Sequence, residues 1–517
     1  MVPPGIPQLF TEYYERRLDK SSKELNVRVL LVYPDHPVTF WSLKHAVKFI
    51  SKEANFPPLG LLTVAALLPE DWEKRLIDMN VQPLGDSDIE WADYVFVSAM
   101  SIQRQSAAKV IKRCARLGVT TVAGGPLFTS SWEDFEGVDH LLLGEAEDTL
   151  PAFLEDLRTG GAKRIYRPDG WADMGRSPIP LWGLVDMKKY ASMNVQYSRG
   201  CPFNCEFCDI TQLYGHKPRT KTGHQVLAEL DGLHAHGWRG GVFFVDDNFI
   251  GNRRKLKAEM LSDLIAWQRE RKYPFDFHAE ASIDLADDEE LMSMMVEAGF
   301  RAVFVGIESP NDMSLSECSK FQNRNRDMVE SVAKIQSYGL QVQGGFIVGF
   351  DNDPPSIFDS QIDFIAKSGI VVAMVGLLNA PRGTRLYKRL QRENRLLKDM
   401  SGDNTDFTMN FIPKMDTTQL IEGYEKVVNA IYSPREYYER VRLFLRRYKP
   451  PRKSRPRLRF VHIRALLRSM WVLGMKREGR LYYWKLFFWS LTRRPKLFPL
   501  AVVFAIYGFH FREVLGT

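Results

Sequence analysis

Apolar residues gather in short runs along most of the chain, and these runs alternate with longer stretches of helical periodicity. The short runs are rich in Val, Leu and Phe, which is typical of strands buried on both faces of a parallel sheet. In the first third of the chain the predicted strands are 27–34, 75–79, 94–98 and 119–123. Apolar stretches at 59–68 and 105–117 predict helices between them. This alternation predicts a parallel, doubly wound, Rossmann-like α/β domain.

The second region repeats the pattern and predicts a partial (β/α)6 barrel. Its predicted strands are 193–198, 241–245, 275–279, 302–306, 345–349 and 371–378. Helical stretches such as 255–270 and 326–338 separate them. In both kinds of parallel sheet, ligands bind at the carboxyl ends of the strands.

Beyond about residue 381 the alternation stops, and stretches such as 385–399 and 417–430 predict a mainly helical region. The predicted segments are an N-terminal arm at 1–25, the Rossmann-like domain at 26–165, a linker at 166–190, the barrel at 191–380, a helical extension at 381–440 and a basic, aromatic tail at 441–517.

Three cysteines lie on one predicted loop, directly after the first barrel strand. Cys201, Cys205 and Cys208 have the spacing C-x3-C-x2-C, and Phe207 precedes the last of them. Three thiolates on a tight loop can bind three irons of a [4Fe–4S] cluster and leave the fourth iron open for chemistry. The alternatives are a zinc site completed by His216, eight residues further on, or three buried free thiols.

This motif resembles that of the radical S-adenosylmethionine (SAM) enzymes, and the order of the domains resembles their cobalamin-binding subclass. The segment Gly144–Leu150 is similar to the G-E-x-E segment that closes the cobalamin domain in that subclass. The stretch from Thr211 to about Arg440 resembles the branch with a C-terminal extension, of which the hopanoid C-2 methylases are the best-known members. The resemblance implies a [4Fe–4S] cluster, SAM and cobalamin as cofactors.

The same resemblance implies roles for residues at the strand ends. In the first domain, the small residues Ser98, Gly124 and Gly125 permit close approach of a flat cofactor. In the barrel, Asp246 or Asp247 replaces the family's missing glutamate that contacts the SAM amino group, Glu280 lies at the ribose position and Glu308 on the adenine side. For each acid alone, a solvated or salt-bridged loop carboxylate is the competing interpretation. No catalytic residue is assigned.

One departure from the cobalamin pattern concerns the cobalt ligand. Asp35 and His36 are adjacent, so the D-x-H-x-x-G motif is absent and His36 is not predicted to bind cobalt. A domain that has kept the fold and lost the cofactor is therefore an alternative.

The net charge of +7 is unevenly distributed. Residues 441–517 contain 19 Lys/Arg and two acids, so this tail is strongly basic and the rest of the chain is acidic. Basic and aromatic residues together predict a peripheral membrane contact. The alternatives are a helical cap on the barrel and RNA binding, and no nucleic acid partner is expected because the aromatics form one run without a recognisable RNA-binding fold. The uncharged stretch 497–509 is short and contains proline, which argues against a spanning helix.

These features predict a methyltransferase that attacks an unactivated carbon of an apolar, hopanoid- or isoprenoid-like lipid. It would need a low-potential electron donor such as flavodoxin or ferredoxin. The alternatives are a radical SAM cyclase or oxidoreductase without methyl transfer, and a non-catalytic cobalamin- or redox-sensing protein. No signal peptide is visible in the first ten residues, and the five cysteines form no disulfide pattern. We therefore expect a cytoplasmic protein, with peripheral contact at the inner face of the membrane as part of that expectation.

Overall fold

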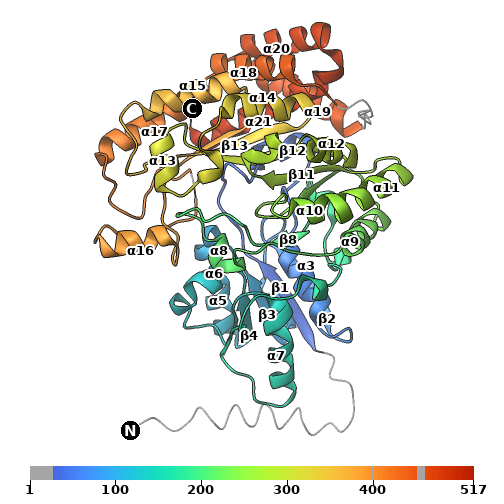
Figure 1. Ribbon diagram of the computed structural model, residues 1–517. Coiled ribbons are helices and arrows are strands. Elements are labelled where there is room, and N and C mark those ends of the chain that lie inside the picture. Colours follow the sequence, from blue (N-terminus) through green and yellow to red (C-terminus); the bar gives the residue numbers. More distant parts are fainter. Residues whose placement is uncertain (1–26, 399, 404, 451–459, 517) are drawn as a thin grey trace.

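The computed structural model describes residues 27–398, 400–403, 405–450 and 460–516. The predicted arm at 1–25 lies outside this range. The described chain forms two parallel six-stranded sheets, one per α/β unit, with a group of C-terminal helices packed against both (Figure 1).

The first sheet has the strand order β2-β1-β3-β4-β5-β6, and every neighbouring pair is parallel. Its strands are β1 (Arg28–Tyr33), β2 (Glu73–Asp78), β3 (Tyr94–Ser98), β4 (Thr120–Gly124), β5 (His140–Leu142) and β6 (Ile165–Tyr166). This order reverses direction between β1 and β3, as doubly wound sheets do, and places a binding crevice at the carboxyl ends of those strands.

Alternate residues of β1 enter different cores, which explains why this strand is apolar throughout. Val29 and Leu31 belong to the core that also contains α3 (Leu59–Leu67) and α7 (Ala146–Arg158). Leu30 and Val32 belong to the core formed with α4 (Asp86–Trp91) and α5 (Arg104–Leu117). Helices therefore cover both faces of the sheet, as the apolar pattern predicted.

The second sheet has the order β14-β13-β12-β11-β10-β7 and is also parallel. Its strands are β7 (Met193–Val195), β10 (Gly241–Phe244), β11 (Asp276–Ala281), β12 (Phe300–Glu308), β13 (Gln341–Val348) and β14 (Ala373–Leu377). Among the described residues β7 and β14 are not paired with each other, so the barrel is partial. Together the two sheets confirm the predicted fold class.

The two faces of the second sheet differ in their partners. Phe244 and Phe277 lie on the face covered by the barrel helices, with ring centroids 5.4 Å apart. Phe243 and Phe304 lie on the opposite, concave face, where segments of the first domain reach them. The Trp41 ring is 5.2 Å from that of Phe304, and the Phe56 ring is 5.3 Å from that of Phe243.

The helices of the C-terminal region are α16 (Arg385–Arg392), α17 (Thr417–Tyr432), α18 (Pro434–Arg447), α19 (Phe460–Trp471), α20 (Arg480–Arg493) and α21 (Phe498–Leu515). The predicted helix at 385–399 was too long. It ends at Arg392 because Asn394 adopts a left-handed conformation with φ 56°, which a continuing helix does not permit.

Helix α21 fastens the C-terminal region to the rest of the protein. The Tyr437 hydroxyl donates to the carbonyl of Phe504 at 2.7 Å, and Phe511 stacks on Phe40 of the first domain at 4.1 Å. We expected proline to interrupt this stretch, but Pro499 lies in the first turn of α21, where the missing N–H has no intrahelical partner to lose. The helix therefore continues past it. The segment Pro495–Leu515 is long and apolar enough to cross a membrane by length and composition alone. Its buried contacts with Tyr437 and Phe40 are those of a core helix.

Candidate active site at the strand ends

A tight turn after β7 carries the three cysteines. Two short strands, β8 (Ser198–Arg199) and β9 (Arg219–Thr220), pair antiparallel and form the base of this cluster loop, residues 200–208. Gly200 has φ +94°, and a Cβ there would lie 2.9–3.0 Å from three carbonyl oxygens. Only glycine fits this position, which turns the chain directly into Cys201.

The three thiols affect one another's ionisation. Burial raises the pKa of Cys208 well above its ordinary value, and the charges of Cys205 and Cys201 raise it further. Burial likewise raises the pKa of Cys201, with a contribution from Cys205. These mutual effects place the sulfurs within electrostatic reach of one another, which fits three ligands of one cluster. Within the described ranges, no three Cys, His, Asp or Glu side chains are gathered as ligands of a single metal ion.

Helix α16 holds the cluster loop from the C-terminal side. The Arg385 guanidinium donates to the carbonyl of Asn204 at 2.7 Å, and the Leu386 amide donates to the carbonyl of Glu206 at 3.0 Å. Arg389 Nε donates to the carboxylate of Glu206 at 2.9 Å. Contacts from two successive turns of α16 thus bracket Cys205.

The first domain holds the same loop from the other side, through buried charges. Arg199 precedes Gly200, and its guanidinium binds Glu145 at 2.8 Å and Glu147 at 2.8 Å. Both carboxylates are almost completely buried, and Arg219 binds Glu145 as well, at 3.0 Å. Burial opposes ionisation of Glu147, but Arg199 outweighs it and lowers the pKa of that carboxyl. The G-E-x-E segment therefore joins the first domain to the cluster loop.

The acids after β10 differ in their surroundings. Asp246 is fully buried, and its carboxylate accepts bonds from the Tyr197 amide at 3.1 Å and the Ser198 hydroxyl at 2.6 Å. Burial raises the pKa of Asp246 to about 6. Its oxygens are thus occupied in shaping the turn that leads into the cluster loop. Asp247 makes one long contact, with the Gly200 amide at 3.4 Å, and is the stronger prediction for a SAM contact.

Asp247 and Glu280 form an acidic group at the ends of adjacent strands. Burial and the neighbouring Asp246 raise the pKa of Asp247 to about 7. Burial, Asp247 and Asp246 raise the pKa of Glu280 to about 8, while Lys320 lowers it. A cationic amino group is the ligand that such an uncompensated acidic group favours.

Glu308 is already paired. It ends β12 at a β-bulge with φ +62°, and Lys320 Nζ binds its carboxylate at 2.8 Å. Burial disfavours the charge on Lys320, but Glu308 and then Cys205 raise its pKa above the ordinary value. Glu308 thus forms the salt bridge that was the competing interpretation for each acid, and its partner is Lys320. Lys320 itself lies close enough to the thiols for Cys205 to affect its pKa.

Ser98, Gly124 and Gly125 meet at the carboxyl edge of the first sheet. A Cβ at Gly125, where φ is +90°, would lie 2.6 Å from Ser98 Oγ, and one at Gly124 would lie 2.9 Å from the Leu142 carbonyl oxygen. This edge therefore stays free of bulky side chains, which fits a flat cofactor. A small crevice lies between the first domain, the residue that follows the cluster loop and the C-terminal region. Its lining includes Ser101, Ser131, Asp209, Arg382 and Asn410.

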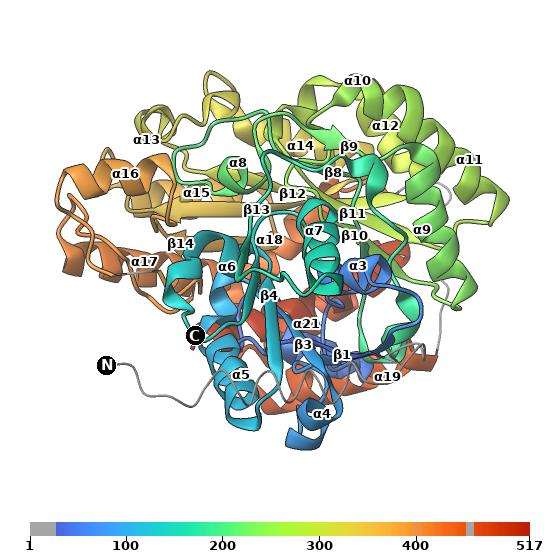
Figure 2. The same cartoon turned by 90° about the horizontal axis from the view of Figure 1, so that it is seen from below.

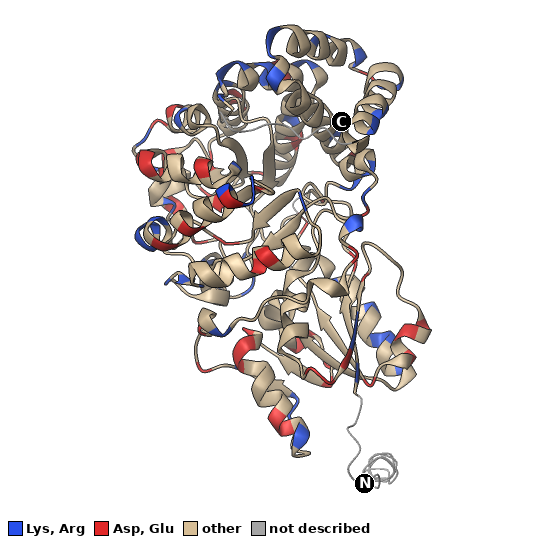
Figure 3. Ribbon diagram, turned by 90° about the vertical axis from the view of Figure 1, so that its right-hand side faces the viewer, with Lys and Arg blue, Asp and Glu red and all other residues tan. Residues whose placement is uncertain are grey.

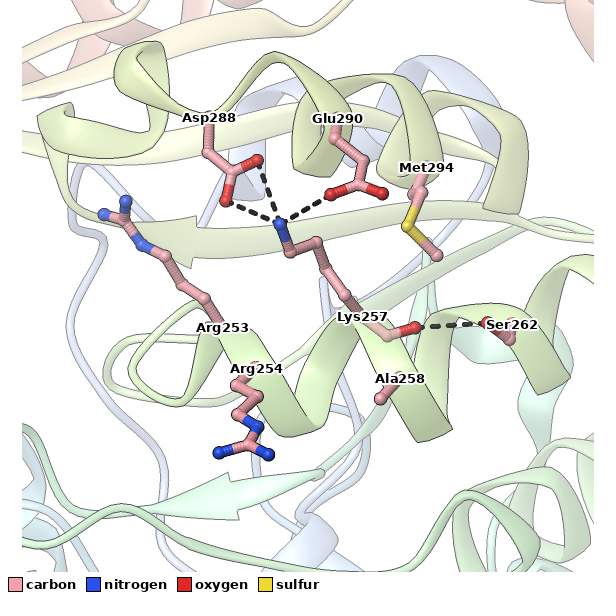
Figure 4. Close-up of a pocket in the computed structure, with 8 residues that line it drawn as sticks. All are labelled: Arg253, Arg254, Lys257, Ala258, Ser262, Asp288, Glu290 and Met294. Carbon is pink, nitrogen blue, oxygen red and sulfur yellow. Dashed lines mark hydrogen bonds and ion pairs between the residues drawn. The ribbon is translucent and has the colours of Figure 1, made fainter.

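A larger pocket of about 560 Å3 lies elsewhere, on the outer helices of the barrel (Figure 4). There the Lys257 ammonium binds Glu290 at 2.8 Å and Asp288 at 3.2 Å. None of its lining residues belongs to a strand end or to the cluster loop, so we do not assign it to the active site.

The sequence analysis missed three features of the site: the Arg199 pair with Glu145 and Glu147, Lys320, and the clamp by α16. Arg199 stands two residues before Cys201, and this adjacency is the one signal that the sequence offered. The other two left no such signal: Lys320 binds Glu308 from 12 positions away, and Arg389 binds Glu206 from 183 positions away.

Comparison with known families divides the chain as the fold does. The B12 binding domain matches residues 49–154, the Radical SAM superfamily matches 195–365, and a domain of unknown function, DUF4070, matches 384–517. The fold and the site therefore define a radical SAM enzyme with a cobalamin-binding domain.

Related proteins narrow this class to methyltransferases. The chain is 42% identical to an uncharacterized methyltransferase of Synechocystis sp. over 94% of this chain and 92% of the relative. It is 35% identical to the hopanoid C-2 methylase of Rhodopseudomonas palustris, over 90% of this chain and 89% of that protein. The chain belongs to this family of cobalamin-dependent radical SAM methyltransferases.

Solved structures agree at the level of the fold. The cobalamin-dependent SAM radical enzyme OxsB has a TM-score of 0.59 at 16% identity, covering 98% of this chain and 84% of that chain. The methyltransferase TsrM of Kitasatospora setae has a TM-score of 0.55 at 17% identity, covering 71% and 76%. The cofactors of the family are a [4Fe–4S] cluster, SAM and cobalamin. Enzymes of this class also need a reductant.

Proposed function

We propose that this methyltransferase acts on an unactivated carbon of a polycyclic, hopanoid- or isoprenoid-like lipid. The observation that carries the proposal is the 35% identity with a hopanoid C-2 methylase over about nine-tenths of both chains. Bacteriochlorophyllide methyltransferases of Chlorobaculum tepidum are more distant, at 24% and 22% identity over about three quarters of the chain. A tetrapyrrole is therefore the second choice.

In this proposal, Cys201, Cys205 and Cys208 bind the cluster. Asp247 receives the SAM amino group and Glu280 the ribose, while Glu308 and Lys320 border the adenine side. Ser98, Gly124 and Gly125 form the bed of the corrin. When bound, these cofactors supply a radical that removes hydrogen from carbon and a methyl group that replaces it, which acid–base groups alone cannot do for an alkane.

The concave face of the barrel supports an apolar substrate. Phe243 and Phe304 lie there, below the acids of the strand ends, and Trp41 of the first domain reaches Phe304 while 38% of Trp41 remains exposed. Aromatic side chains give a flat, largely desolvated surface suited to a fused-ring hydrocarbon.

Helices α19 and α20 support contact with a membrane, from which such a lipid would come. Apolar side chains at helical spacing are exposed along both: Phe460, Ile463, Leu467, Trp471 and Met475 on α19 and its continuation, and Leu481, Phe488 and Leu491 on α20. Residues 460–496 contain nine Lys/Arg and one acid, and the charged residues on the helices at the top of Figure 3 are mostly basic. An apolar stripe flanked by cations fits an anionic bilayer surface.

The function is tested by lipid analysis of a host that makes hopanoids and lacks its own C-2 methylase. Cells expressing the wild-type chain should contain a lipid heavier by one methylene group, and cells expressing Cys201→Ala should not. Cys114→Ala, which removes a buried thiol outside the cluster loop, is the matched control and should keep the product. A product that is oxidised or cyclised but not methylated would favour a radical SAM cyclase or oxidoreductase, and it would refute methyl transfer to this lipid.

The membrane contact is tested by flotation with vesicles of phosphatidylglycerol and phosphatidylcholine. The wild-type chain should float with anionic vesicles and much less with neutral ones. Leu467→Ser combined with Phe488→Ser should abolish flotation, whereas Met313→Ser, an exposed apolar residue outside these helices, should not. Equal flotation of all three proteins would refute the role of α19 and α20.

A further inference from the structure

Helix α16 presents one strongly basic face to solvent. Residues 382–398 contain seven Lys/Arg and one acid. Arg385, Lys388 and Arg392 follow one another at spacings of three and four residues, so they lie on one side of the helix, and all three are exposed. Lys388 and Arg392 have no acidic partner within the described part of the chain. Arg389, four residues after Arg385, is instead turned toward the protein and is neutralised by Asp351 and Glu206.

The same helix is in direct contact with the cluster loop. The Asn204 carbonyl that accepts from Arg385 belongs to the peptide bond that leads into Cys205. The guanidinium also donates to Ser319 Oγ at 2.9 Å. One surface cation thus lies a single peptide unit from a cluster thiol. In Figures 1 and 2, α16 stands at the edge of the molecule beside α13 (Asp312–Glu317), in keeping with its exposed basic residues.

Apolar side chains border this basic face. Phe321 is 61% exposed and Met313 is 62% exposed. Phe321 lies on the turn that also carries Gln322, whose Nε2 is 4.0 Å from Cys205 Sγ. An apolar centre with a charged rim is the usual composition of a protein–protein interface, and weak redox encounters use small ones.

We propose that the exposed face of α16, together with Phe321, is the docking site of an acidic, low-potential electron-transfer protein of the flavodoxin or ferredoxin class. One electron leaves the reduced donor, which is oxidised by one electron, and enters the cluster held by the three cysteines; no bond forms and no proton is required. Long-range electrostatic attraction draws acidic donors to such a face. Because α16 contacts the cluster loop, a donor that docks on this face lies next to the loop of Cys205.

The proposal also gives the first helix of the domain of unknown function a role. α16 begins that domain, and it would couple an external partner to the loop that binds the cluster. The other basic surface, on α19 and α20, lies at the top of Figure 1, away from α16. It packs on α18 and on the short helix η1 (Lys48–Ile50).

The test compares two sources of electrons for the same reconstituted enzyme. Lys388→Glu combined with Arg392→Glu reverses the exposed face and leaves Arg385 and Arg389, which hold the loop, unchanged. With a flavodoxin and its NADPH-dependent reductase, or with a ferredoxin, SAM cleavage by the variant should slow about tenfold at low salt. With dithionite, cleavage should match the wild type. Arg480→Glu combined with Arg493→Glu, on α20, is the matched control and should behave as wild type with every reductant.

A binding measurement gives a readout that does not depend on turnover. Oxidised flavodoxin should bind the wild-type protein with an affinity that falls as salt is added, and the α16 variant should bind at least tenfold more weakly. A zero-length carbodiimide crosslink should join Lys388 to a donor carboxylate. An unchanged donor-driven rate, an equal loss with dithionite, or an equal loss in the α20 control would each overturn the proposal. Because it rests on the proposed cluster ligands, the dithionite reaction of the wild type separates failure of the cluster from failure of docking.

Discussion

Replacing Arg199 by Met tests whether the buried charges hold the first domain on the cluster loop. Met keeps the length and apolar stem of the side chain and removes the guanidinium. Glu145 would still bind Arg219 at 3.0 Å. Glu147 would lose the one guanidinium that binds its carboxylate among the described residues. Its side chain is 2% exposed, so water cannot replace the lost partner.

The magnitude follows from that stranded carboxylate. Removing one partner of a buried ion pair costs about 3–5 kcal/mol, because the remaining charge keeps its desolvation penalty. Replacing both partners by apolar residues of similar size is often close to neutral. We therefore expect Arg199→Met to cost about 3–5 kcal/mol, and Arg199→Met with Glu147→Leu to cost clearly less than the single change. If the two substitutions acted independently, the second would add to the cost of the first, so a double variant that is more stable than the single one shows that the two residues interact.

The pH dependence has a definite sign. Arg199 outweighs burial and lowers the pKa of Glu147 from its ordinary 4.5, so the pair stabilises the fold above that pH and its contribution is lost as the pH falls. In the Met variant the attraction of Arg199 is gone, so burial, the largest of the remaining effects, raises the pKa of Glu147 against its backbone hydrogen bond and Ser177. The difference between wild type and variant should therefore be largest near neutral pH and shrink as the pH approaches about 4.5.

The assay is urea unfolding of the cluster-free proteins under anaerobic conditions, followed by circular dichroism between pH 5 and pH 8. Arg104→Met is the matched control, since its partner Asp134 is 34% exposed and the pair should be worth less than about 1 kcal/mol. A loss below about 1 kcal/mol for Arg199→Met, or a loss that does not change with pH, would refute the reasoning.

Three further predictions follow from other parts of the site and the fold. Cys201→Ala should lose most of the cluster iron after reconstitution, measured by iron content and visible absorption, while Cys114→Ala keeps it; equal iron in both would contradict the assignment of the ligands. Glu280→Gln should stabilise the protein at pH 8.5 but not at pH 4.5, because the pKa of about 8 means that ionising this acid destabilises the fold as the pH rises; parallel pH profiles of the free energy of unfolding would contradict this. Phe511→Ala should lower the stability by about 3–5 kcal/mol, because Phe511 is completely buried against Phe40, and a loss of less than 1 kcal/mol would argue against the docking of α21 on the first domain.

The amino-acid sequence by itself determined which elements form and which cofactors the family uses. Strands such as 94–98 and helices such as 105–117 appear where the apolar pattern predicts them, because burial on one or both faces is encoded in neighbouring residues. The cysteine spacing is also local, since all three ligands must lie on one loop. A helix cap is equally local: the Thr222 hydroxyl accepts from the amide of Gln225, three residues further on.

Only the tertiary structure decided what surrounds the site. Two adjacent acids, Asp246 and Asp247, look alike in sequence, but packing gives the first one fixed partners and leaves the second with one long contact. The charges that hold the cluster loop come from Glu147, 52 positions before Arg199, and from Arg389, 183 positions after Glu206. Such pairs depend on how the two sheets and the C-terminal helices come together, and no local periodicity records that. The same holds for α21, which by composition passes as a spanning helix, whereas its contacts with Tyr437 and Phe40 place it in the core.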